Sequence, residues 1–96
     1  MSPKNKKKLD IIRKKLDQID NQLLAIIKKR TFLVNEVVKL KENKSEIVDQ
    51  KRISSILKNI KAKSIKNKID PKITNRIWKN MIWSYINYER RSFKKK

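Results

Sequence analysis

The sequence contains no cysteine, no histidine and no glycine among its 96 residues. The lack of cysteine excludes a disulfide framework and a thiolate nucleophile, and the lack of histidine removes the commonest general base and a usual zinc ligand. Without glycine there is no loop of the kind that cradles nucleotide phosphates. No run of about 18 apolar residues could span a membrane, and no apolar signal core follows the basic N-terminus. We therefore expect a cytoplasmic protein and, if it is an enzyme, chemistry that uses no thiol, imidazole or nucleotide loop.

Acidic residues are also scarce, since 9 Asp and Glu face 28 Lys and Arg, which leaves a net charge of +19. Such a charge is typical of proteins that bind nucleic acid. The cations, however, are spread over both ends of the chain, the helix surfaces and both connections, so the sequence does not favour a nucleic-acid-binding module. A compositional bias toward Lys, Asn and Ile explains a solvated basic surface, and no motif indicates an acidic protein partner. A field of this sign speeds the encounter with small anions.

Apolar spacing predicts an all-α domain with one long helix and two shorter ones over residues 9–93. The long helix is expected at 8–42 and the shorter ones at 50–64 and 71–93. Asp49 and the pair Asp70 and Pro71 are the expected start signals of the shorter helices. We expect disordered basic tails at 1–8 and 94–96. The apolar seam of the long helix consists of Leu9, Ile12, Leu16, Ile19, Leu23, Ile26, Leu33, Val37 and Leu40.

One position in this seam holds Arg30 instead of an apolar residue. A guanidinium inside an apolar seam costs several kcal/mol unless an anion meets it. The residues three and four positions away on the helix are all apolar, so the anion comes from another segment or from a ligand. An unbroken coiled coil, the non-catalytic alternative, would not place an arginine there.

A second apolar stripe runs beside the seam, and two short helices alone leave part of it uncovered. A chain this small also buries little core. Both points predict an oligomer in which the long helix packs against its symmetry mate. The second stripe consists of Leu24, Ile27, Val34 and Val38.

The spacing of three cations fits this oligomer. Arg30 and Lys41 are 11 residues apart, about 16 Å along a helix, and on nearly the same face, so they can hold a small dianion between them. Arg13 is 17 residues from Arg30, about 25 Å, which is too far for one helix to serve a single pocket. If Arg13 serves the same pocket, it comes from the other subunit of an antiparallel pair.

With these cations in place, the chain resembles the all-helical chorismate mutases over about residues 9–93. The resemblance rests on several charged positions in order, because no single piece is specific. The implied fold is an intertwined homodimer of three-helix subunits, and the implied reaction is the rearrangement of chorismate to prephenate on the route to phenylalanine and tyrosine. The matching pieces are IIRKKLDQID at 11–20, LLAIIKKR at 23–30, VVKLK at 37–41, Asp49 and Arg52, IDP at 69–71, and IWKNMIWSYINYE at 77–89.

The resemblance also implies roles for individual residues. Arg13 of one subunit and Arg30 of the other hold the two carboxylates of the substrate, while Lys41 and Glu89 face the ether oxygen of the breaking bond. The rearrangement is intramolecular, so it needs orientation and placed charge but neither a metal nor a cofactor. The remaining residues are Asp49, Arg52 and Tyr85 in the polar wall and Val37, Ile53, Ile82 and Ile86 in the apolar wall.

Three of these positions depart from the mutase pattern. Ile53 stands where the family has a glutamate that binds the ring hydroxyl, and Tyr85 stands where it often has a small hydroxyl residue. Both resemble isochorismate-pyruvate lyase, a relative with the same fold, which stays as the alternative activity. Glu89 replaces the usual Gln, and it must be protonated to donate a hydrogen bond to the ether oxygen. We therefore expect activity to fall as the pH rises.

Overall fold

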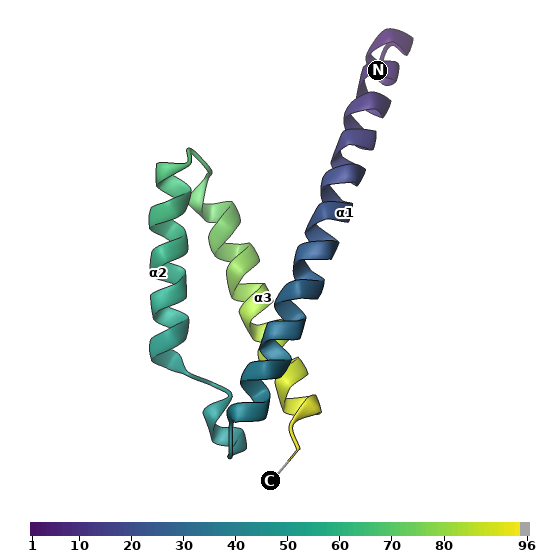
Figure 1. The fold of residues 1–96 in the computed structure, drawn as a ribbon. Helices are drawn as coiled ribbons and strands as arrows, with labels where there is room; N and C mark the ends of the chain where they lie inside the picture. Colours follow the sequence, from purple (N-terminus) through teal and green to yellow (C-terminus); the bar gives the residue numbers. More distant parts are fainter. Residues whose placement is uncertain (95–96) are drawn as a thin grey trace. The chain divides into compact units, whose positions relative to one another are not determined.

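The computed structural model describes residues 1–94, and its regular structure is helical (Figure 1). Helix α1 covers Pro3–Leu40, α2 covers Gln50–Lys66 and α3 covers Pro71–Ser92, with a short 3-10 helix η1 at Lys44–Glu46. Over residues 1–94 there is no strand, which confirms the prediction of an all-α chain with one long and two shorter helices. The chain forms two compact units, Met1–Leu33 and the part from Val34 onward, and each is described by itself.

Helix α1 begins five residues before the predicted start at residue 8, so residues 3–8 are helical where a disordered tail was expected. The sequence analysis overlooked Ser2 and Pro3. The Ser2 hydroxyl accepts a hydrogen bond from the backbone amide of Asn5 at 3.2 Å, as an N-cap serine does. Proline is favoured at the first helical position because its missing N–H has no partner there in any case.

The same helix ends at Leu40, two residues before the predicted end at residue 42. The backbone amides of Glu42 and Asn43 donate to the Glu46 carboxylate at 2.6 and 2.7 Å, which holds the chain in a turn toward η1 instead of a continued helix. Lys41, expected on the helix, is therefore the residue that follows it, although its backbone amide still donates to Val38 at 3.1 Å.

The predicted caps of the two shorter helices are confirmed. The Asp49 carboxylate accepts from the amide of Arg52 at 3.0 Å, and the Asp70 carboxylate accepts from the amide of Lys72 at 2.9 Å, with Pro71 at the first helical position. Helix α2 runs two residues past its predicted end, and α3 ends one residue early.

Helices α2 and α3 lie side by side (Figure 1), and their contact carries the core. Its buried members are Ile47, Ile82 and Ile86. Near the connection between α2 and α3, the hydroxyls of Ser64 and Thr74 are buried and 2.7 Å apart. Each satisfies the other, which removes the cost of burying either one alone. The partly buried residues packed against this core are Val48, Ile53, Ile56, Leu57 and Phe93.

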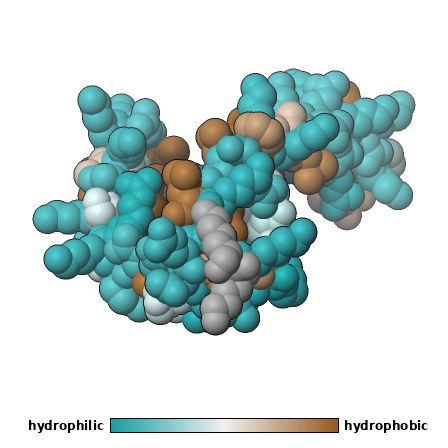
Figure 2. All heavy atoms as spheres, turned by 60° about the horizontal axis from the view of Figure 1, so that its bottom comes forward, coloured by the Kyte–Doolittle hydropathy of each residue, from teal (hydrophilic) through white to brown (hydrophobic). Residues whose placement is uncertain are grey.

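No residue of α1 is buried. Its seam leucines and isoleucines from Ile12 to Leu33 are each about half exposed, and Leu40 is 80% exposed. Figure 2 shows hydrophobic side chains at the surface among the hydrophilic ones. An apolar stripe this long on a single exposed helix is larger than the scattered apolar residues normal for a surface.

Candidate active site

The strongest polar feature of the unit that starts at Val34 is an ion pair between Lys41 and Glu89. The Lys41 ammonium donates to Oε1 of Glu89 at 3.4 Å, and the two side chains are only 18% and 9% exposed. Lys41 follows the end of α1, and Glu89 lies near the end of α3, 48 residues further along the chain. The sequence analysis placed both residues at the same ether oxygen but did not foresee that they contact each other. The pair is a charged and largely dehydrated group.

A second contact beside this pair joins the same two helices. Tyr88, next to Glu89, donates its phenol hydrogen to Oδ1 of Asn35 at 2.8 Å. Tyr85 packs edge to face against Tyr88, with ring centroids 6.4 Å apart at 85°. The hydrogen bond joins the last turns of α1 to α3. The sequence analysis missed Asn35 and Tyr88, because neither residue type stands out until the helices are placed together.

The predicted apolar wall is assembled in part. Ile82 and Ile86 are buried, and they precede Glu89 by seven and three residues, so the three share one face of α3. Ile53 of α2 packs against the same core. Val37 is the exception, since 48% of it is exposed. The carboxylate of Glu89 thus emerges from an apolar surface.

The polar residues predicted on α2 lie at its first turn. Asp49 and Arg52 are both exposed, and the Asp49 carboxylate is occupied by the backbone amide of Arg52. On α1, Arg13 is exposed and Arg30 is half-buried. Both belong to the unit Met1–Leu33.

The charged groups of this arrangement are Lys41 and Glu89. In residues 1–94 no three His, Cys, Asp or Glu side chains cluster as metal ligands do. In the same part of the chain, none of the helices has the length and apolar character needed to cross a bilayer. What the site provides is an ammonium group, a carboxyl group and an aliphatic wall.

Fold and site together define an all-helical protein that brings a lysine just after one helix and a glutamate on another into one dehydrated pair. The sequence model of one family, described as chorismate mutase type II, matches residues 12–90. The chain belongs to this family. No curated protein and no solved structure matches the chain.

Proposed function

We propose that the protein is a chorismate mutase, an isomerase that rearranges chorismate to prephenate. The observation that carries the proposal is the buried pair of Lys41 and Glu89 in a chain of the type II chorismate mutase family. In the rearrangement the breaking C–O bond leaves partial negative charge on the ether oxygen. An ammonium group aimed at that oxygen from a dehydrated site stabilises the transition state more than the ground state.

The substrate's two carboxylates need cations of their own, and we assign them to Arg13 and Arg30. A planar guanidinium binds a carboxylate through two parallel hydrogen bonds, so two arginines fix the orientation of a dicarboxylate. The reaction then proceeds within one molecule, without cofactor or metal. We propose residues 9–93 as the catalytic domain and the cytoplasm as its compartment.

We further propose that the active protein is an intertwined homodimer. The exposed seam of α1 supports this, because burying the exposed half of one Leu or Ile contributes ~1 kcal/mol and the seam holds seven of them from Ile12 to Leu40. In this dimer Arg13 of one subunit completes the pocket that holds Arg30 and Lys41 of the other. Size-exclusion chromatography with light scattering tests the assembly, and a monomer with full activity would exclude a shared site.

The function is tested by assaying purified protein with chorismate and following prephenate. Arg30→Ala is expected to lower kcat/KM at least 100-fold, because it removes a charge-assisted contact to the substrate. Lys29→Ala is the matched control, since it removes a neighbouring exposed cation from the same helix. Equal activity of the two variants would take Arg30 out of the site.

A second activity, isochorismate-pyruvate lyase, is favoured by one observation. Ile53 packs into the core beside Ile82 and Ile86, so α2 offers no carboxylate to the ring hydroxyl of chorismate at that position. The same protein is therefore assayed with isochorismate. Salicylate and pyruvate formed faster than prephenate would move the assignment to the lyase, with Ile53 and Tyr85 as the residues that determine specificity.

The role of Glu89 is tested by pH. In the pair its oxygen accepts from Lys41, whereas in catalysis it must donate to the ether oxygen and so must carry a proton. The active form is then the protonated one, and kcat should be highest at low pH and decrease as the pH rises. Glu89→Gln donates at every pH, so its profile should be flat. A flat profile of the unmodified protein between pH 5 and 9 would exclude a protonated Glu89.

A further inference from the structure

The pair of helices α2 and α3 carries positive charge with very few acidic residues to offset it. Residues 50–88 contain ten Lys and Arg and a single acidic residue, Asp70. The carboxylate of Asp70 is itself engaged with the first turn of α3. Helix α1, by contrast, contains four acidic residues among its cations. Residues 50–88 thus have a net charge of +9, against +7 for α1, and differ from α1 mainly in the scarcity of acidic residues among the cations.

Within this part, helix α3 gathers cations on one exposed face. At 100° per residue, Lys72, Arg76, Lys79, Trp83 and Arg90 fall within an arc of about 60° around the axis. All five are exposed, and Trp83 keeps 43% of its surface accessible. The row spans 18 residues, about 27 Å. We call these five residues the α3 basic face.

No acidic side chain interrupts the α3 basic face. The one acidic residue within α3, Glu89, is buried and paired with Lys41. Asn80 and Asn87 are exposed beside the row and add amide donors and acceptors. At its N-terminal end a shallow hollow is lined by Lys72, Ile73, Arg76, Ile77 and Asn80.

We propose that the α3 basic face binds single-stranded nucleic acid, a function separate from the site at Lys41 and Glu89. Four cations one to three turns apart would follow the phosphate backbone, and Trp83, between Lys79 and Arg90, offers its ring to a base. Strands of this kind are bound by basic surfaces that carry aromatic stacking platforms, with little dependence on base sequence.

The position of Trp83 favours a nucleic acid over the other polyanions. A helix that lies on an anionic membrane separates its apolar and basic residues onto opposite faces. Here the tryptophan lies among the cations, and the exposed isoleucines Ile73 and Ile77 flank only the first half of the row. An acidic peptide would satisfy the cations but has no flat ring for the indole to stack on.

The proposal is tested with fluorescein-labelled oligo-dT and oligo-U of about 16 nucleotides, by anisotropy at several salt concentrations. Four phosphate contacts predict a slope of about −2.8 in log K against log salt, so affinity should fall about 50-fold between about 50 and 200 mM. Arg76→Glu with Lys79→Glu should weaken binding at least tenfold and reduce the slope by about 1.4. Trp83→Ala should weaken binding about tenfold, and Trp83→Phe should restore most of it.

The matched control is Lys14→Glu with Lys15→Glu, which changes the net charge equally on α1. It should alter affinity less than threefold, and chorismate turnover by the α3 variants should match that of the unmodified protein. Equal losses in the two double variants would overturn the proposal, because net charge alone would then explain binding. If the unmodified protein binds polyglutamate or phosphatidylserine vesicles more tightly than the oligonucleotides, the proposal is overturned too. This comparison uses no variant, so it holds even if a variant fails to fold.

Discussion

The pair of Lys41 and Glu89 predicts a strong energetic coupling that can be measured apart from catalysis. At 3.4 Å the attraction between the two charges is about 5 kcal/mol for an effective dielectric constant near 20. Removing both side chains from water offsets much of this. We expect a net coupling free energy of about 2 kcal/mol between the two side chains.

The measurement is a double-mutant cycle in the free energy of unfolding, by denaturant titration at one fixed protein concentration. Lys41→Met leaves a buried carboxylate without its cation and should cost about 4 kcal/mol. Glu89→Gln leaves an amide oxygen for the ammonium and should cost about 2 kcal/mol. The double variant should lose about 4 kcal/mol rather than the sum of about 6.

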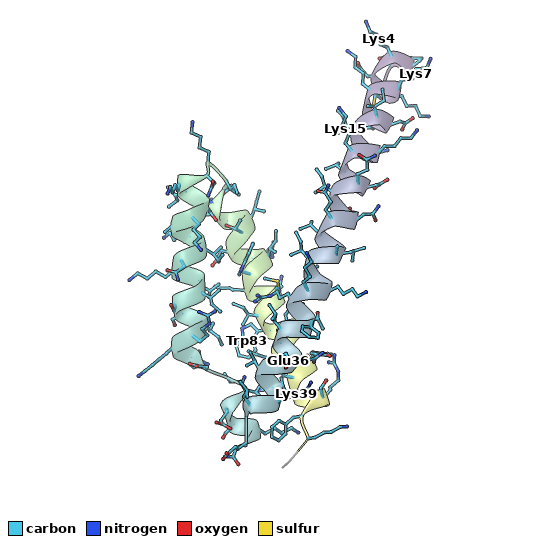
Figure 3. The ribbon with its side chains drawn as sticks, viewed as in Figure 1. Lys4, Lys7, Lys15, Glu36, Lys39 and Trp83 are labelled. Carbon is cyan, nitrogen blue, oxygen red and sulfur yellow. The ribbon has the colours of Figure 1, made fainter. Side chains whose placement is uncertain are left out.

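The chain contains its own control for this cycle. Glu36 and Lys39 form an ion pair that is shorter, at 3.2 Å, but its side chains are 50% and 71% exposed (Figure 3). Water and salt screen an exposed pair, so its coupling should be below about 0.5 kcal/mol. A coupling of Lys41 with Glu89 no larger than that of this control would refute the inference that dehydration makes the pair strong.

Three further predictions concern contacts that support the site. Ser64→Ala should lower the free energy of unfolding by about 1–2 kcal/mol, because the buried hydroxyl of Thr74 loses its 2.7 Å partner. Adding Thr74→Val should lower it by less than a further ~1–2 kcal/mol in the same denaturant titration, because the unpaired hydroxyl is then removed. Asp70→Ala should cost about 1 kcal/mol of unfolding free energy through the lost cap of α3, whereas Asp70→Asn should cost little. Tyr88→Phe removes the donor to Asn35; it should cost about 1 kcal/mol and lower kcat more than it raises KM, and steady-state kinetics indistinguishable from those of the unmodified protein would show that this bond does not position the site.

Much of the local structure follows from the sequence. The period of the apolar residues predicts three helices, and the caps at Asp49 and Asp70 mark where the shorter ones begin, because these effects act within one turn of a helix. The errors in the predicted ends of α1 also have local causes. Ser2 starts α1 earlier than predicted, and the Glu46 carboxylate captures two backbone amides and ends it before Lys41.

The candidate site could be predicted as a set of residue types but not as a geometry. The sequence alone indicates that cations at set spacings serve an anion, because the chain lacks the residues that other chemistries need. Only the tertiary structure places Lys41 against Glu89 and Tyr88 against Asn35, at separations of 48 and 53 residues along the chain. It also decides that Ile53 packs into the core and that the face of α3 that carries the cations is exposed. Helical period and capping act over a few residues, whereas these contacts depend on how the elements from Val34 onward pack against one another, which no short-range pattern in the sequence specifies.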